Sequence, residues 1–383
     1  YARIAARMIK SDPSRAIEYE AFAERVNGEQ PAGSTGPLGN KHFWRSDTMV
    51  QREPGWYASV RFHSTRVYAT ETRTNHENLK GYHLADGTYF ILQRGDEYHE
   101  VQPVWNYRRL PGLTYLDTAA PIPYGRDTPQ AGNTDFVGGA SDGLMGVGVM
   151  DYDKAGVSAK KAYFFSPEGF ICLGAGIRSQ EPERVLTTLN QCRLRSNISV
   201  LQGDEIVSIE TGTKNDTNIR AIHHDGIAYV LLDDHTLSIT AQQQRGSWQD
   251  VEAKAPDEQI PQDIFTCFVD HGSKPNDESY AYRVVPGIDS NRLTFAANDT
   301  TVSVLSNSPK LQAVHVSTHD VTQAVFHAQG ELALPDGRIL SADKPCTLIL
   351  RQTGEGQFLL AVSDPAQSQR QIVLGLTGRY AGR

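Results

Sequence analysis

Cysteine is scarce in this sequence, and long apolar runs are missing. Four cysteines occur among 383 residues, and no two of them have Cys-x-x-Cys spacing. That pattern disfavours a zinc site and a disulfide-dense scaffold. Buried free thiols are the first expectation, and a Cys172–Cys192 bridge is the alternative. No stretch approaches the ~20 consecutive apolar residues of a membrane-spanning helix, so we predict no membrane span.

Motifs that would announce a cofactor are also missing. The sequence has no His-Glu-x-x-His zinc motif and no Gly-x-Ser-x-Gly nucleophile elbow. Residues 138–143 (GGASDG) lack the Lys-Ser/Thr of a phosphate loop and are expected to form a turn with positive φ. His223 and His224 precede Asp225-Gly226, which predicts a solvated hairpin turn rather than a metal site. We predict no metal and no cofactor, while a Ser/His/Asp triad, defined by geometry alone, stays open.

Acidic residues outnumber basic ones, but not in the first third of the chain. The net charge is −8, made up of +2 in residues 1–110 and −10 in the remainder. This balance disfavours a nucleic-acid binder. If the chain contacts a polyanion, the N-terminal third is the expected place.

The first residues have a helical pattern. Apolar residues recur at helical spacing, a break is expected at Ser11–Ser14, and Asn27-Gly28 is a stop signal. We predict helices within residues 1–28 and a Gly- and Pro-rich linker over 29–40. The helical positions are Ile4, Ala5, Met8, Ile9, Ala16, Ile17, Ala21 and Phe22.

The rest of the chain is predicted to be β-structure. Short runs rich in aromatic and β-branched residues are bounded by turns such as Asp86-Gly87 and Asp225-Gly226, which is typical of antiparallel sandwiches. Residues 186–189 fit either a helical turn or a strand. A boundary near 287–300 divides a large sandwich over 41–288 from a small one over 289–383. The clearest predicted strands are 56–62, 66–68, 88–92, 162–165 and 227–232.

Polar side chains crowd the connection between two of these strands. Glu71, Asn75, Glu77 and Asn78 follow each other closely. Such a segment can line a sugar-binding or catalytic rim. The alternative is an Asx-rich connection that satisfies its own backbone.

The order of residues here resembles polysaccharide lyase family 8, which contains the chondroitin AC, hyaluronate and xanthan lyases; the chondroitin AC branch is the most similar. The resemblance rests on Ser-Thr-Arg at 64–66, Glu71, Asn-His-Glu-Asn-Leu-Lys-Gly at 75–81 and Pro-Val-Trp-Asn-Tyr-Arg-Arg-Leu-Pro-Gly at 103–112. It continues through the later segments 135–143, 160–165, 172–177, 187–191, 270–275, 280–282 and 311–314.

The resemblance implies a three-part enzyme: an α/α toroid, a large antiparallel supersandwich and a small β-sandwich. Residues 1–28 would be the last toroid helices. Because the chain begins at Tyr1 without a signal peptide, we expect a piece of a longer protein that is nearly inactive alone. In the family the toroid supplies the Tyr, His and Arg of a catalytic tetrad and an Asn for the uronate carboxylate. None of these four can be placed here.

Two site residues can be carried over from the family. Glu71 matches the catalytic Glu of the tetrad, and Asn75 matches a residue that reaches the substrate. The implied activity is β-elimination on chondroitin- or hyaluronan-type polysaccharide to a 4,5-unsaturated uronate, by a secreted or periplasmic enzyme. The implied partners are this acidic polysaccharide and the toroid of the same enzyme. For Glu71 the alternative is a surface ion pair with Arg66 or Arg73, of about 0–1 kcal/mol.

One departure from the family concerns calcium. Some chondroitin AC-type members have a calcium site near the Trp105 region, where this chain has Asn106, Arg108 and Asp117-Thr118. An arginine cannot ligate Ca²⁺, so we predict no calcium there. Trp105 and Tyr107 suit either stacking on a sugar face or a core role.

Two other classes remain open from the sequence. One is a non-catalytic carbohydrate-binding β-sandwich protein, and the other is an accessory sandwich domain of a glycoside hydrolase.

Overall fold

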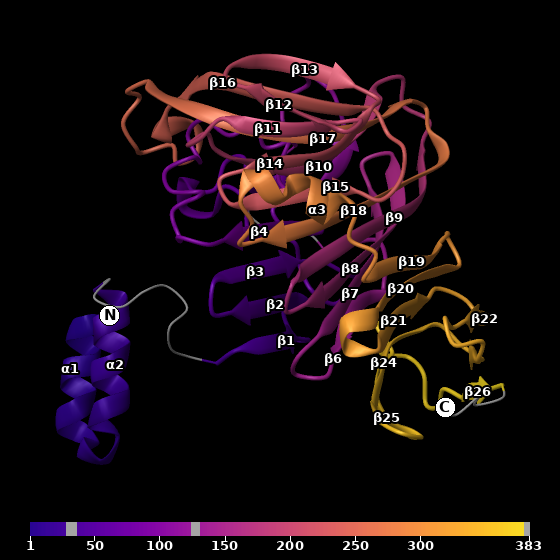
Figure 1. The fold of residues 1–383 in the computed structure, drawn as a ribbon. Helices are drawn as coiled ribbons and strands as arrows, with labels where there is room; N and C mark the ends of the chain where they lie inside the picture. The colour runs from indigo at the N-terminus through magenta and orange to yellow at the C-terminus, as the bar shows by residue number, and fades with distance from the viewer. Residues whose placement is uncertain (28–36, 124–130, 379–383) are drawn as a thin grey trace.

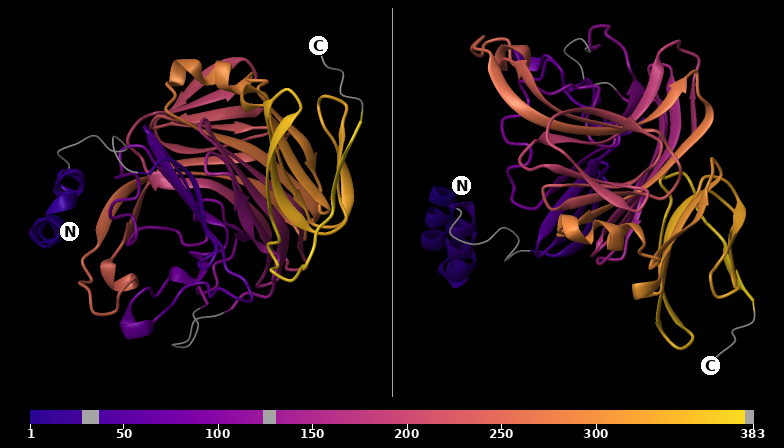
Figure 2. Two further views of the ribbon diagram at one scale, coloured as in Figure 1. Left: turned by 90° about the horizontal axis from the view of Figure 1, so that it is seen from below. Right: turned by 45° about the horizontal axis from the view of Figure 1, so that its top comes forward.

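Two short helices open the chain in the computed structural model, which describes residues 1–27, 37–123 and 131–378. α1 spans Ala2–Ser11 and α2 spans Ala16–Val26, with one 3-10 turn at Pro13–Arg15 between them. The break falls where predicted, because proline lacks the N–H that would continue α1. The pair stands apart from the sheets (Figures 1 and 2). Its apolar side chains remain 40–82% exposed: Ile4, Met8, Ile17 and Phe22.

A four-stranded sheet of order β1-β2-β3-β4 follows. Its strands are β1 (Gly39–Phe43), β2 (Thr48–Glu53), β3 (Trp56–Arg61) and β4 (Thr88–Leu92). β1 begins inside the predicted linker 29–40, most of which lies outside the described residues. In β3, Trp56, Ala58 and Val60 are buried while the alternate residues are not, so one face of the sheet joins the core and the other faces outward.

A nine-stranded antiparallel sheet forms the middle layer, with order β12-β11-β14-β15-β18-β9-β8-β7-β6. Its central strands are buried on both faces. In β8, Tyr163 and Phe165 belong to one hydrophobic core, and Ala162 and Phe164 belong to another. Strand bounds are β6 (Val137–Ser141), β7 (Gly146–Lys154), β8 (Val157–Ser166), β9 (Gly169–Ser179), β11 (Ile198–Gln202), β12 (Glu205–Ile209), β14 (Ile219–His224), β15 (Ile227–Leu231) and β18 (Asn276–Pro286).

A five-stranded sheet and the four-stranded sheet share the larger core with one face of the middle sheet. The five-stranded sheet consists of β13 (Gly212–Asp216), β16 (Leu237–Gly246), β17 (Ile260–Ser273), β10 (Arg184–Arg193) and β5 (Thr114–Leu116). Residues 186–189 are therefore strand, which resolves the helix-or-strand alternative.

A smaller sandwich ends the chain and covers the opposite face of the middle sheet (Figure 1). The short helix α3 (Leu293–Ala297) precedes it. Its two sheets are β19 (Val302–Asn307), β20 (Leu311–Val316), β21 (Val321–Phe326), β24 (Cys346–Gly354) and β25 (Gln357–Ser363), and β22 (Gly330–Ala333), β23 (Ile339–Ala342) and β26 (Leu374–Thr377). The predicted mainly β sandwich architecture is confirmed.

Three local predictions are wrong in whole or in part. Residues 66–68 are not a strand, because the Arg66 guanidinium donates to the carbonyls of Asp135 and Val137 and thereby holds the segment in a loop. Residues 138–141 belong to β6, and only the end of the predicted turn 138–143 is a turn, where Gly143 has the expected positive φ of 91°. His223 and His224 end β14 with 8% and 1% exposure, so they are packed rather than solvated.

The cysteines and the helices agree with two other expectations. All four cysteines are buried free thiols, so the Cys172–Cys192 bridge is excluded. Within the described parts of the chain, no helix is long and apolar enough to cross a membrane.

Candidate functional site

The predicted site residues lie on one long connection, residues 62–87 between β3 and β4. It contains only two single 3-10 turns, Thr74–His76 and Gly81–His83. Connections of this length without regular structure are uncommon in compact domains and usually serve function.

The backbone of this connection is strained where the prediction places the site. Arg73, Asn75, His76 and Asn78 all have positive φ, between 51° and 70°. Non-glycine residues in this region cost of order 1 kcal/mol or more each and persist only where surrounding contacts hold them. Such clusters occur preferentially at functional sites.

Hydrogen bonds hold the strained loop in place. The Asn78 side-chain amide donates to the carbonyl of Glu71 at 2.6 Å. The loop is also tied to the segment after β16, because Leu79 N donates to Val251 O and Ala253 N donates to His76 O, each at 2.9 Å. Asn78 therefore fixes the loop, in agreement with the alternative that these polar residues satisfy the backbone of their own connection.

Glu71 and Asn75 are both exposed on this loop. Neither side chain makes a hydrogen bond or ion pair with a residue of the described chain. The alternative surface ion pair between Glu71 and Arg66 is not formed, because the Arg66 guanidinium donates its hydrogen bonds to the backbone carbonyls of Asp135 and Pro365. Within the described residues, no hydrogen bond or ion pair accounts for the Glu71 carboxylate, which is exposed to a group outside them.

An open groove of about 740 Å³ borders the loop at Asn78. Its half-buried aromatic lining comes from three separate elements: Tyr57 on β3, Phe90 on β4 and Trp248 after β16. Trp105 and Tyr107 form its floor with 7% and 3% exposure, so they have the core role rather than the stacking role. Trp248 was not predicted, because nothing in its local sequence connects it to residues 59–117.

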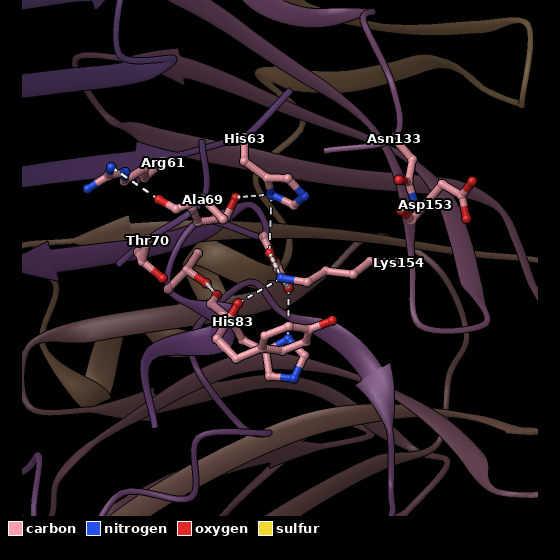
Figure 3. A network of polar contacts seen from close by, with 12 residues as sticks. Arg61, His63, Ala69, Thr70, His83, Asn133, Asp153 and Lys154 are labelled. Atoms are coloured by element: carbon pink, nitrogen blue, oxygen red, sulfur yellow. Dashed lines mark hydrogen bonds and ion pairs between the residues drawn. The ribbon is translucent and has the colours of Figure 1, made fainter. Parts of the chain in front are cut away.

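A buried ionic cluster clamps the two ends of the same connection (Figure 3). Asp86 is its centre and comes from the returning end. Lys154 Nζ, at the end of β7, lies 2.9 Å and 3.0 Å from the two carboxylate oxygens. His83 Nδ1 lies 2.7 Å from Oδ2, and His63 Nδ1, from the departing end, lies 3.2 Å from Oδ1. The predicted turn at Asp86-Gly87 is confirmed, since Gly87 has a φ of 73° and Asp86 N donates to His83 O just before β4, while the Asp86 side chain is fully buried in the cluster.

Electrostatics favour an ionised aspartate in this cluster. Burial alone would raise the pKa of Asp86, but the Lys154 ammonium and the hydrogen bonds from the two histidines hold that pKa well below its usual range. Burial lowers the pKa of His83, which keeps its imidazole neutral. The His83 Nε2 atom is buried without a hydrogen-bond partner among the described residues, as an unprotonated nitrogen tolerates.

A second buried lysine joins the cluster from β8. Lys161 Nζ donates to the carbonyls of Asp86 and Gly112 at 2.9 Å and 2.6 Å, and burial lowers its pKa from 10.5 to about 7. Between pH 7 and 10.5, Lys161 is protonated in the unfolded chain but mostly neutral in the folded chain. The unfolded state therefore binds more protons, and the free energy of unfolding rises with pH in this range and falls as the pH approaches 7.

We expect this titration to appear in the unfolding free energy. The stability of the chain relative to a Lys161→Met variant should rise by up to about 1.4 kcal/mol per pH unit between pH 7 and 9.5. Urea unfolding of both proteins across that range measures the difference. A difference that does not change with pH would show that Lys161 stays charged in the folded state.

The expected calcium position holds an ion pair instead of a free carboxylate. The Arg109 guanidinium lies 2.5 Å from Asp117 Oδ1, and Asn106 Oδ1 accepts a hydrogen bond from Arg108 N at 2.9 Å. In residues 1–27, 37–123 and 131–378, no group of three or more His, Cys, Asp or Glu is placed to hold a metal ion. That no calcium binds there stays a prediction.

Comparison with known families agrees with this architecture. Residues 38–297 match the polysaccharide lyase family 8 super-sandwich domain, and residues 303–373 match the C-terminal beta-sandwich domain of the same family. The chain belongs to polysaccharide lyase family 8.

Individual relatives cover this chain almost completely but extend beyond it. It is 32% identical over 99% of its length to the chondroitinase-AC of Pedobacter heparinus, and 30% identical over 86% to a hyaluronate lyase of Thermasporomyces composti. A solved chondroitinase AC lyase superposes with a TM-score of 0.91 at 30% identity, covering 97% of this chain and 55% of the other. The chain spans about half the length of the curated relatives it matches, 53% and 43% of these two.

Proposed function

We propose that this chain is the β-rich portion of a lyase that cleaves uronic-acid-containing polysaccharide, of chondroitin or hyaluronan type, by β-elimination. The observation that carries the proposal is the strained loop 71–78 of a family 8 chain, whose Glu71 carboxylate forms no ion pair with the described residues and whose Asn78 borders an aromatic groove. The relatives named above are chondroitin and hyaluronate lyases, and their substrates are acidic polysaccharides. Because such polymers occur outside cells, we propose a secreted or periplasmic protein.

The chemistry of β-elimination explains why Glu71 needs further groups from another domain. The C5 proton of a uronate is weakly acidic while the neighbouring carboxylate is charged. Donors that neutralise this carboxylate stabilise the enolate-like transition state. A base then removes the C5 proton, the bond between C4 and the glycosidic oxygen breaks, that oxygen receives a proton, and a C4=C5 double bond forms.

Glu71 cannot provide all of these functions. In this proposal it holds an Arg or His of a toroid by charge-assisted hydrogen bonds, and it thereby tunes the base and orients the donors. Asn75, exposed on the same loop, contacts the substrate. Residues 1–27 are the end of that toroid, and the uncovered apolar face of α1 and α2 supports a helical partner.

An assay of the complete protein tests the proposal. Incubation with chondroitin, hyaluronan and xanthan should produce absorbance near 230 nm from the unsaturated uronate. The chain of 383 residues alone, as the control, should produce almost none. Cleavage without this chromophore would favour an accessory domain of a glycoside hydrolase, and binding without cleavage would favour a carbohydrate-binding module.

A further inference from the structure

Exposed aromatic and basic side chains gather at one end of the four-stranded sheet, where the 62–87 connection leaves β3. Phe43, Trp44 and Tyr68 are 49%, 54% and 57% exposed. We call this set the hairpin patch, after the β1–β2 hairpin that carries most of it. Its members are Lys41, Phe43, Trp44, Arg45, Arg61 and Tyr68, all of them exposed.

The strand register places Lys41, Phe43 and Arg61 on the outward face, and Trp44 and Arg45 follow Phe43 in the turn. Phe43 pairs with Thr48, which pairs with Arg61, so Phe43 and Arg61 lie in one row across the sheet. Lys41 shares their face because it lies two residues from Phe43 on the same strand. The Arg61 guanidinium donates to Ala69 O at 3.2 Å (Figure 3), and the exposed Tyr68 is the residue before Ala69.

The cations of the hairpin patch are not neutralised by carboxylates of the described residues. Lys41, Arg45 and Arg61 form no ion pair with any residue that the structure describes. Arg45 instead lies over the Trp44 ring, 4.9 Å from its centroid. The hairpin has two carboxylates. Asp47 is 1% exposed and accepts a hydrogen bond from Ser64, and Glu53, at the far end of β2, accepts one from the Gln51 side chain at 2.6 Å, so neither forms an ion pair with the patch.

We infer that the hairpin patch binds acidic polysaccharide as a subsite next to the Glu71 loop, an inference that rests on the function proposed above. Aromatic faces pack against the C–H face of sugar rings, and Lys and Arg pair with carboxylate or sulfate groups. The two kinds of group alternate here, as the sugar rings and charges of such a polymer do. A nucleic acid would also meet the cations, but membership of a polysaccharide lyase family favours the polysaccharide.

A second exposed pair offers a matched control. Arg292, just before α3, lies 5.3 Å from the ring centroid of Phe295, which is on α3 and 65% exposed. It has the same chemistry as Trp44 and Arg45 but lies outside the hairpin patch. A general effect of removing an exposed arginine and aromatic ring can therefore be distinguished from an effect specific to the hairpin patch.

The test compares binding of chondroitin sulfate oligosaccharides by the unaltered chain, by a Trp44→Ala/Arg45→Ala variant and by an Arg292→Ala/Phe295→Ala variant, measured by calorimetry. We expect the first variant to bind about tenfold more weakly or worse, with an unchanged melting temperature, and the second to bind normally. Dextran, which is neutral, should bind weakly to all three. The inference would be overturned if the unaltered chain and the first variant bound chondroitin sulfate with equal affinity, or if both variants lost affinity equally. If the unaltered chain bound single-stranded DNA more tightly than chondroitin sulfate, the patch would be a nucleic-acid site instead.

Kinetics of the complete protein separate this inference from the proposed function. With the Trp44→Ala/Arg45→Ala change, the 230 nm assay should show KM for long substrate raised about tenfold and kcat unchanged. Normal chromophore production with unchanged KM would reject the hairpin patch as a subsite and support the proposed lyase activity. Polysaccharide binding that depends on the hairpin patch, without any chromophore, would reject the proposed lyase activity and support the patch as a binding site.

Discussion

A Glu71→Gln change in the complete lyase should lower kcat by about 100-fold or more while leaving the melting temperature unchanged. The Glu71 carboxylate is exposed and forms no hydrogen bond or ion pair with the described residues, so we expect folding to lose little when its charge is removed. Catalysis loses the charge that orients and tunes the groups around the base. The 230 nm assay measures the first quantity and thermal unfolding the second.

Glu77 offers the control for this prediction, because it is an exposed carboxylate on the same loop. Glu77→Gln changes charge and shape identically, six residues away. It should retain nearly full turnover. Full turnover in Glu71→Gln, or equal losses in both variants, would remove Glu71 from the catalytic group.

The largest stability effect should come from Asp86→Asn. The change leaves Lys154 in a buried site without its counter-charge, and unpairing a buried ion costs about 3–5 kcal/mol. Both ends of the 62–87 connection are tied to this carboxylate, so its strained backbone should also lose order. Urea unfolding of the chain measures the free energy.

Two further variants identify the cause of that effect. Asp153→Asn alters an exposed carboxylate next to Lys154 in sequence and should cost less than about 0.5 kcal/mol. Asp86→Asn combined with Lys154→Met should recover part of the loss, because no unpaired ammonium remains buried. A loss below about 1 kcal/mol in Asp86→Asn would show that the cluster contributes little.

Local pattern was sufficient for much of the fold. Proline at position 13 divides the helices, and Asp225-Gly226 forms the hairpin between β14 and β15, with φ of 53° and 80°. The unbroken apolar run at 162–165 is explained by the middle sheet, which is buried on both faces. Each of these features depends on residues that are close in sequence.

The candidate site was only partly predictable. Residue order alone pointed to Glu71 and Asn75, and the structure places both on one exposed loop. It did not point to His63, His83 and Lys154 around Asp86, because Lys154 is 68 residues away from Asp86 in the chain. Trp248 joins the groove for the same kind of reason, since only tertiary folding brings β16 to the β3–β4 connection.

The sequence by itself determined the periodicities, the turns, the mainly β class and the family, because these depend on local chemistry and on the order of residues. The tertiary structure decided that 66–68 is a loop, that the turn residue Asp86 is a buried anion, and that the Glu71 carboxylate forms no ion pair with the described residues. These outcomes depend on which distant groups meet, and on the desolvation cost of a charge once it is buried. That cost cannot be assessed until the surrounding residues are known.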